Sequence, residues 1–278
     1  MTEQTQTPSV YTGPLRAAIF DWAGTTLDFG SRAPVQAVSK LFADRQVPVT
    51  QAQARGPMGM AKRDHLAAVF AMPEVAERWQ QEHGNPPGKA DLDRMYADFM
   101  PTQRECLAEH SELIPGCLKA IADCRSRGMK IGSSTGYTRE LMDVLVPLAR
   151  KQGFEADVVL CAGDVSAGRP APYMCWEIAR RLAVYPAAAI VKVDDTVVGV
   201  EAGRNAGMWA IGVVLSGNEV GLSQPELAKL SPEERQERCE LASAKLRRAG
   251  AHELVDTIAD IPAAVERINL RLSRGDRP

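Results

Sequence analysis

Acidic, basic and hydroxyl-bearing residues stand at the ends of four apolar runs in this 278-residue chain. They are Asp21 after AAIF, Thr135 and Gly136 after MKIGSS, Arg169 in the loop after DVVLC, and Asp194 with Asp195 at the end of AIVKVD. Singly, each fits a turn or a helix cap. Together they supply a carboxylate, backbone N–H groups with a hydroxyl, a cation and an acidic pair, which are the parts that hold a phosphoryl group and Mg²⁺.

The same apolar runs predict the elements that position these residues. Runs at 17–21, 129–134, 157–161, 189–194 and 210–214 have the length of buried strands, and helical patterns at 118–127, 139–153 and 172–183 separate the later ones. Such alternation is typical of an α/β fold with a doubly wound, Rossmann-like parallel sheet. Ligands bind such sheets at the carboxyl ends of the strands, so we expect the four groups to converge there.

One long segment breaks the alternation. Between residues 28 and 113 the sequence shows no good strand, and it predicts helices at 35–45, 60–72, 75–83 and 90–110. We therefore expect an inserted helical cap domain at 31–111 and an α/β core at 1–30 and 112–278, with hinges near 28–33 and 111–116. Residues 1–13 are expected to be a flexible tail, and the segments 231–240, 242–250 and 252–268 to be helical.

Composition excludes several classes of protein. The formal charge is −2, with 45% hydrophobic and 24% charged residues, which argues against nucleic acid or an anionic membrane as a partner. The polar start MTEQTQTPSVYTGP predicts neither a signal peptide nor a membrane span. Six scattered cysteines and four separated histidines give no disulfide framework and no zinc spacing. A cytoplasmic enzyme with a small-molecule substrate is the expectation.

The order of the strand-end residues resembles that of the haloacid dehalogenase superfamily across nearly the whole chain. The resemblance implies that Asp21 is the nucleophile that attacks phosphorus. It also implies that Thr135 and Gly136 bind phosphoryl oxygens and that Arg169 replaces a more usual lysine. Asp195 would be the Mg²⁺ ligand, with Asp194 as its support or as a second ligand.

One residue departs from the phosphatases of that superfamily. In FDWAGTTLD, residues 20–28, the position that carries a second acidic residue in phosphatases is Ala23. That acid protonates a departing alkoxide, so its absence predicts either very weak phosphatase activity or a leaving group that needs no such proton. A lysine offers the second route, because an imine formed with an aldehyde is an electron sink for a neighbouring carbon–phosphorus bond.

The cap segment GPMGMAKRDH contains such a lysine. Lys62 and His65 are spaced i and i+3 on one face of a predicted helix. A surface lysine on an amphipathic helix is the ordinary interpretation. However, Lys62 follows a small, glycine-containing stretch, as a helix that enters an active site would. Arg63 and Arg169, if they lie nearby, would favour the neutral, nucleophilic amine.

The segments FDWAGTT, PMGMAKRDH, STGYTRE, AGRPAPYMCW and KVDDT together are similar to the phosphonatase branch of the superfamily. This resemblance implies hydrolysis of phosphonoacetaldehyde to acetaldehyde and phosphate with Mg²⁺, through a Schiff base on Lys62 and an aspartyl-phosphate on Asp21. It further implies that the Ala23 carbonyl is a metal ligand and that the enzyme is a homodimer through its cap.

Three further residues and one departure follow from the same resemblance. His65 and Tyr137 match positions near the substrate, and Met58 is expected to line the pocket. Gly199 stands where some superfamily members have an acidic residue, so Asp194 or water must complete the surroundings of the metal.

Two other functions remain open at this point. A phosphate-monoester phosphatase would use Lys62 only to bind substrate, and Ala23 argues against it. A non-catalytic sensor of a phosphorylated ligand would not need the full set of catalytic residues. Borohydride trapping on Lys62 distinguishes the first hypothesis from both, because only an imine can be trapped.

Overall fold

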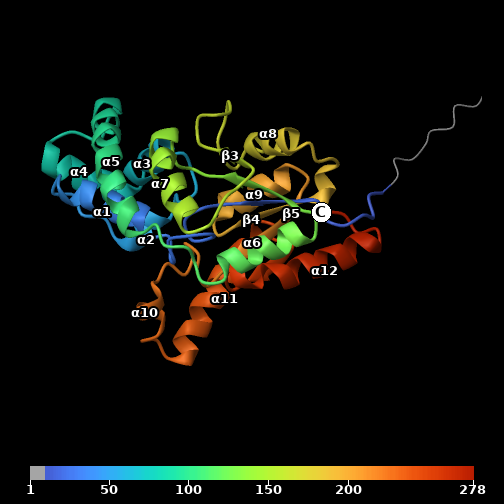
Figure 1. Cartoon of the computed structure of the whole chain (residues 1–278). Helices are drawn as coiled ribbons and strands as arrows, with labels where there is room; N and C mark the ends of the chain where they lie inside the picture. The colour runs from blue at the N-terminus through green and yellow to red at the C-terminus, as the bar shows by residue number, and fades with distance from the viewer. Residues whose placement is uncertain (1–9) are drawn as a thin grey trace, which may run out of the picture.

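The computed structural model describes residues 10–278, so the first nine residues of the tail expected at 1–13 lie outside the described part of the chain. Its centre is a six-stranded sheet in the order β3-β2-β1-β4-β5-β6, with every neighbouring pair parallel (Figure 1). The strands are β1 (Ala17–Phe20), β2 (Lys130–Ser134), β3 (Val158–Leu160), β4 (Ile190–Asp194), β5 (Trp209–Val213) and β6 (Glu253–Val255). The predicted doubly wound α/β fold is confirmed.

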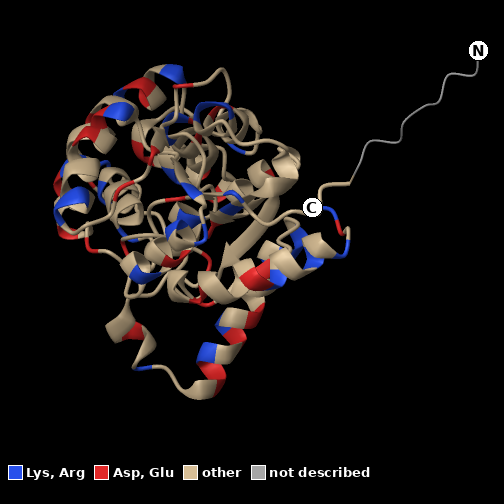
Figure 2. Ribbon diagram, turned by 45° about the vertical axis from the view of Figure 1, so that its right-hand side comes forward, with Lys and Arg blue, Asp and Glu red and all other residues tan. Residues whose placement is uncertain are grey.

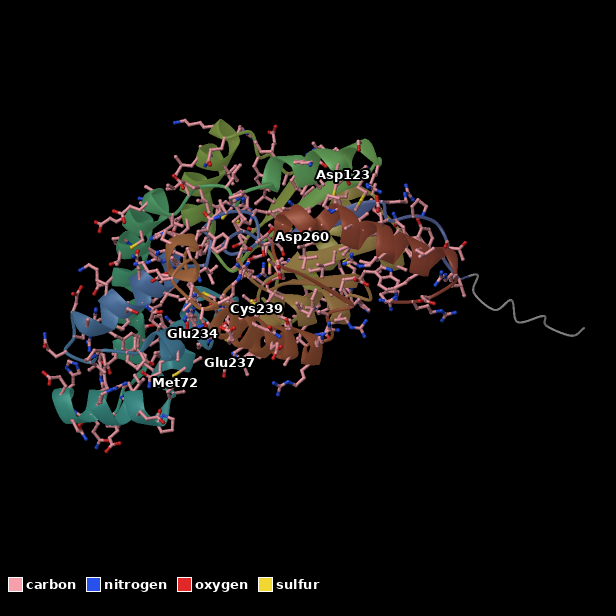
Figure 3. The ribbon with its side chains drawn as sticks, turned by 90° about the horizontal axis from the view of Figure 1, so that it is seen from below. Met72, Asp123, Glu234, Glu237, Cys239 and Asp260 are labelled. Atoms are coloured by element: carbon pink, nitrogen blue, oxygen red, sulfur yellow. The ribbon has the colours of Figure 1, made fainter. Side chains whose placement is uncertain are left out.

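Side chains alternate between two hydrophobic clusters along β1. Ala18 and Phe20 join a cluster with α6 (Cys117–Ser126) and α12 (Ile261–Ser273), whereas Ala17 and Ile19 join one with α8 (Tyr173–Leu182). Because successive side chains of a strand point to opposite faces, helices must cover both sides of the sheet. Figure 3 shows α6, labelled at Asp123, beside the helix that follows Asp260.

Further helices complete the layers around the sheet. They are α7 (Arg139–Lys151), α9 (Val197–Asn205), α10 (Gln224–Leu227) and α11 (Pro232–Arg248), with short 3₁₀ turns at Ala187–Ala189 and Ile258–Asp260. Helix α9 packs on β4 and β5, and α11 packs on α9, β5 and β6. The sheet is thus buried on both faces, as its continuous apolar strands require.

Five consecutive helices between β1 and α6 form a separate layer with its own apolar cluster. They are α1 (Ala33–Ala43), α2 (Gln51–Arg55), α3 (Lys62–Phe70), α4 (Pro73–His83) and α5 (Lys89–Glu109), to the left of the sheet in Figure 1. Leu41, Phe42, Met95 and Phe99 are among the buried residues of this cluster. The division into a cap at 31–111 and a core stays a prediction, and this separate cluster supports it.

Two parts of the sequence-based element assignment need correction. The helix expected at 252–268 is wrong at its start, because Glu253–Val255 pairs with β5 as the sixth strand and the helix begins only at Ile261. The short helix α2 was not anticipated. Its Thr50 and Gln53 form a reciprocal capping box that the pattern of apolar residues does not reveal.

Charges of both signs are interleaved over the helices, and no face of Figure 2 is of one sign alone. Among residues 10–278, no helix is long and apolar enough to span a membrane.

Truncation of Phe99 tests whether the helical layer unfolds as a unit of its own. Phe99 is fully buried in that layer, and we expect Phe99→Ala to cost about 3 to 5 kcal/mol of local stability. Hydrogen exchange should then accelerate across residues 33–109 more than in the sheet. Ile211→Ala in β5 is the matched control, with the opposite distribution expected. Equal loss of protection in both regions from either variant would mean a single cooperative unit.

Candidate active site

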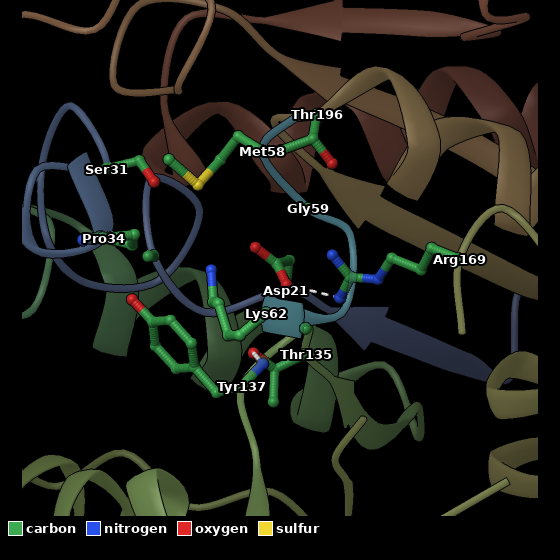
Figure 4. A pocket seen from close by; sticks show the side chains of 12 residues that line it. Asp21, Ser31, Pro34, Met58, Gly59, Lys62, Thr135, Tyr137, Arg169 and Thr196 are labelled. Atoms are coloured by element: carbon green, nitrogen blue, oxygen red, sulfur yellow. Dashed lines mark hydrogen bonds and ion pairs between the residues drawn. The ribbon is translucent and has the colours of Figure 1, made fainter. Parts of the chain in front are cut away.

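Three charged side chains meet at the carboxyl end of the sheet. Asp21 follows β1, Asp194 ends β4, and Arg169 comes from the loop after β3. The Arg169 guanidinium donates from Nη2 to Asp21 Oδ1 at 2.5 Å, and its Nη1 lies 3.2 Å from Asp194 Oδ2. All three side chains are buried, and Figure 4 shows the link between Arg169 and Asp21. The convergence predicted from the strand ends is therefore present.

Arg169 holds its place through more than these two carboxylates. Its Nη2 also donates to the Ser134 hydroxyl at 3.3 Å and to the Ser134 carbonyl. Burial opposes the charged form, but Asp194 and Asp21 outweigh it and raise the pKa of Arg169 above its ordinary value. Its Nε has no hydrogen-bond partner among the described residues. A permanently charged side chain with a buried free donor suits an anionic ligand.

Asp21, Asp194 and Asp195 place carboxylate oxygens within 4.8 Å of one another. Burial is the main cause that raises the pKa of both Asp21 and Asp195, and repulsion between the carboxylates adds to it. A cation among them would remove that repulsion, and oxygen ligands of this kind are those that hard divalent cations prefer. The residues therefore fit a divalent metal.

The three carboxylates differ in their remaining contacts. Asp195 accepts the Thr25 hydroxyl at 2.9 Å and the Asn218 backbone N–H at 2.8 Å. Asp194 instead lies 2.6 Å from Lys192 Nζ, itself fully buried. Burial opposes ionisation of Asp194, yet Arg169 and Lys192 keep its pKa below the ordinary value. Asp194 is thus the carboxylate already neutralised by protein cations, which suits a supporting position beside the metal.

Gly199 is explained by the same carboxylate. A Cβ at this position would overlap the side chain of Asp194, whose carboxylate occupies that space. Only glycine at 199 leaves room for this carboxylate in its present position.

Lys62 enters the pocket from the helical layer as the first residue of α3. Its side chain is only 3% exposed, and Nζ lies 4.9 Å from the centroid of the Tyr137 ring. Lys62, Asp21 and Ala23 line one small cavity, and Figure 4 shows the side chains of Lys62 and Asp21 at it. The amine of Lys62, the carboxylate of Asp21 and the guanidinium of Arg169 thus line one small, largely buried cavity.

Close backbone approach lets the turn before α3 reach the sheet. Gly59 has φ +88°, and a Cβ there would lie 2.5 Å from the Thr196 hydroxyl. On the other side, a Cβ at Gly136 would lie 2.7 Å from the Met60 carbonyl oxygen. The turn therefore lies between two core loops, at a separation that a side chain on either glycine would prevent.

Comparison with known proteins agrees with this geometry. The family model described as haloacid dehalogenase-like hydrolase matches residues 15–207. A phosphonoacetaldehyde hydrolase of Syntrophobacter fumaroxidans is 46% identical over 96% of this chain and 97% of its own length. One of Paraburkholderia phytofirmans is also 46% identical, over 95% of this chain and 99% of its own.

A solved structure extends the likeness to three dimensions. The phosphonoacetaldehyde hydrolase-like protein of Oleispira antarctica is 39% identical, covers 98% of this chain and 99% of its own, and superposes with a TM-score of 0.96. The chain belongs to the phosphonoacetaldehyde hydrolase family. It is accordingly an enzyme, a hydrolase of the haloacid dehalogenase-like type.

Most of the residues singled out in the sequence of this hydrolase lie around the one cavity. Those that line it are Asp21, Ala23, Met58, Lys62, Thr135, Gly136, Tyr137 and Arg169. Asp194 and Asp195 lie in the adjoining carboxylate cluster. The Thr135 hydroxyl accepts the Tyr137 backbone N–H at 3.1 Å, which fixes the loop that follows β2.

His65 is buried beside the cavity rather than in its wall. Its Nε2 lies 2.8 Å from the Ala54 carbonyl oxygen, so this nitrogen carries the proton and Nδ1 does not. Burial, with Lys62 adding to it, lowers the pKa of His65 to about 3. The ring is neutral at physiological pH, with Nδ1 unpartnered among the described residues.

The sequence did not identify every residue at the cavity of the hydrolase. Ser31, Pro34, Gly59 and Thr196 also line it. Thr196 directly follows the acidic pair and could have been found from that position. Gln103 of α5 is fully buried and lies near the Tyr137 hydroxyl, but its sequence looks like any helix interior.

The pKa of Lys62 is lowered by burial and Arg169, without the contribution expected from Arg63. Burial is the main cause that lowers its pKa from 10.5 to about 8, Asp21 opposes this, and Arg169 adds to it. The expected help from Arg63 is absent, because that guanidinium turns away and pairs with Asp93 at 2.5 Å. At a pKa of about 8, roughly a tenth of the amine is neutral at pH 7, against about one in three thousand for an ordinary lysine.

Reductive methylation with ¹³C-formaldehyde followed by NMR titration tests this. The resonance assigned to Lys62 by comparison with Lys62→Arg should titrate near pH 8, because burial disfavours the ammonium form. A Lys62 resonance whose midpoint lies near the ordinary lysine value of about 10.4 would contradict the depressed pKa.

Proposed function

We propose that this hydrolase cleaves the carbon–phosphorus bond of phosphonoacetaldehyde to give acetaldehyde and phosphate. The observation that carries the proposal is the buried pairing of an amine, Lys62, with a carboxylate, Asp21, in one cavity. Ala23 stands where a phosphatase would need its acid. The similarity to phosphonoacetaldehyde hydrolases over nearly the full length supports the same substrate.

Lys62 begins the reaction. Its neutral amine attacks the aldehyde carbon and water leaves, which gives an imine. Once protonated on nitrogen, the imine draws electrons from the carbon that bears phosphorus. The depressed pKa of Lys62 supports this role, because only the neutral amine is a nucleophile.

Asp21 completes the bond exchange. A carboxylate oxygen attacks phosphorus, the carbon–phosphorus bond breaks, and its electron pair moves to carbon to form an enamine on Lys62. Protonation of the enamine carbon and addition of water release acetaldehyde and the free lysine. Water then hydrolyses the aspartyl-phosphate and releases phosphate. No alkoxide leaves at any step, so no acid is needed at position 23.

The remaining residues bind and orient. We assign the phosphoryl oxygens to Arg169, whose buried Nε is free, and to Thr135 with the Gly136 backbone. Tyr137 and Met58 shape the wall against which Lys62 lies. His65 stays uncharged at physiological pH, and we propose that its free Nδ1 accepts a hydrogen bond that orients the groups around Lys62 during imine formation.

We propose Mg²⁺ as the metal, held by Asp21, Asp195 and the Ala23 carbonyl, with Asp194 in support. Bound there, the ion would offset the repulsion between Asp21 and an incoming phosphoryl group. The contribution of the chain itself is a rigid oxygen set, because Thr25 and the Asn218 backbone fix Asp195.

We also propose that residues 31–111 act as a cap that opens and closes to exclude water. It would move at two connecting segments, the first near residues 28–33 and the second near 111–116. The contact of the Gly59 turn with the Thr196 and Gly136 loops supports this, because these surfaces join the helical layer to the sheet at the cavity. Opening would move Lys62 away from Asp21.

Phosphate release from phosphonoacetaldehyde in the presence of Mg²⁺ tests the function. Lys62→Arg keeps the positive charge but cannot form an imine, and Asp21→Ala removes the attacking oxygen. We expect both variants to lose more than about a thousandfold in kcat, and excess chelator to abolish wild-type activity. Incubated with phosphonoacetaldehyde, wild type and Asp21→Ala should both be reduced by borohydride to a stable adduct on Lys62, whereas Lys62→Arg should give no adduct.

Each outcome separates the alternatives. Activity retained by Lys62→Arg would exclude the imine and favour a phosphate-monoester phosphatase. Binding of phosphonate with no turnover by wild type would favour a sensor. The intact set of Asp21, Arg169 and Asp195 in one cluster argues against a sensor.

We further propose that the enzyme is a homodimer through the helical layer, as the family resemblance implies. Sedimentation equilibrium at micromolar concentration should give twice the chain mass of 30.2 kDa. A mass that stays at one chain across the concentration range would contradict the dimer.

A further inference from the structure

Arg55, the last residue of α2, links the helical layer to two other segments. Its Nη1 donates to the Gly30 carbonyl at 2.8 Å, the Ser31 carbonyl at 3.2 Å and the Asn218 amide oxygen at 3.3 Å. Its Nη2 donates to the Gly221 carbonyl at 2.7 Å. Gly30 and Ser31 belong to the first connecting segment, whereas Asn218 and Gly221 belong to the loop after β5.

Both partner segments lead directly to the active site. Ser31 lines the cavity, and the Asn218 backbone N–H donates to Asp195 Oδ2 at 2.8 Å. The Arg55 carbonyl in turn accepts the Met58 backbone N–H at 2.9 Å and so begins the turn that leads to Lys62. Arg55 therefore contacts both the turn that leads to the Lys62 amine and the loop that binds the Asp195 carboxylate.

The loop after β5 is shaped to receive the guanidinium. Gly221 has φ +69°, and a Cβ there would lie 2.6 Å from Arg55 Nε. The four oxygens lie around the planar guanidinium, whose several N–H donors point in fixed directions. The ammonium group of a lysine could not reach all four. Charged hydrogen bonds of this kind are stronger than neutral ones, more so because Arg55 is partly buried.

We propose that Arg55 is a positioning residue that latches the helical layer onto the sheet with Lys62 facing Asp21. The proposal rests on the proposed function for its kinetic consequence, although the latch itself is independent of the substrate. Arg55 does not line the cavity. It acts through the turn that begins at Met58 and through the loop that holds Asp195.

Three variants test the latch. Arg55→Ala removes all four contacts, and Arg55→Lys keeps the charge without the fork. Arg78→Ala is the matched control, because the hydrogen bond of Arg78 Nη2, to the Gln53 side chain at 3.1 Å, stays within the helical layer. We expect kcat/KM for phosphonoacetaldehyde and the rate of borohydride trapping on Lys62 to fall about a hundredfold in Arg55→Ala. Free guanidinium should restore both, and Arg78→Ala should match wild type.

Hydrogen exchange supplies a readout that needs no activity. In Arg55→Ala and Arg55→Lys, amides of residues 28–31 and 216–222 should exchange at least tenfold faster, with the strands unchanged. Unaltered exchange in both variants would overturn the latch even if the enzyme has another substrate. If free guanidinium does not restore the lost activity, and the Tm falls in both variants, Arg55 has only a structural role. That result would also overturn the proposal.

Discussion

Charge compensation among buried side chains is the constraint on which the rest of this enzyme depends. Asp21, Asp194 and Asp195 lie together with two buried cations, Arg169 and Lys192. Lys62, which is largely protonated at pH 7, lies across the same cavity from Asp21. A further cation among the three carboxylates would reduce their mutual repulsion, and the Nε of Arg169 leaves a donor for an anion. The apolar sheet and the helical layer bury these charged side chains, which strengthens their interactions.

The same burial acts oppositely on Lys62. A carboxylate cluster nearby would favour its ammonium form, yet desolvation outweighs Asp21 and the pKa falls to about 8. The alanine at position 23, besides removing an acid, also affects the pKa of Lys62. An aspartate at position 23 would place one more carboxylate in the cavity wall and favour the charged, unreactive amine. The uncharged form of Lys62 is therefore more accessible with Ala23 than it would be with an acid at that position.

Steric complementarity decides how the two layers meet. Gly59 and Gly136 allow backbones to approach where any side chain would intrude, and Gly199 leaves space for the Asp194 carboxylate. The contacts of Arg55 extend this fit away from the cavity, to the first connecting segment and the loop after β5. The position of Lys62 therefore depends on close backbone contacts at the cavity and on hydrogen bonds of Arg55 outside it.

The sequence by itself determined five of the six strands, the run of helices after β1, and the residues at the strand ends. Asp21, Thr135, Arg169 and Asp195 could be placed together because parallel strands present their carboxyl ends at one edge. Local pattern carries that information.

Only the tertiary structure decided what depends on distant contacts. The strand Glu253–Val255 forms because β5 offers a free edge, and Arg63 turns from Lys62 because Asp93 of α5 is its partner. His65 is neutral because its ring is buried against Ala54, and Asp194 fills the space over Gly199. Each of these outcomes joins residues whose side chains meet only after packing, and no spacing along the chain specifies their burial or distance.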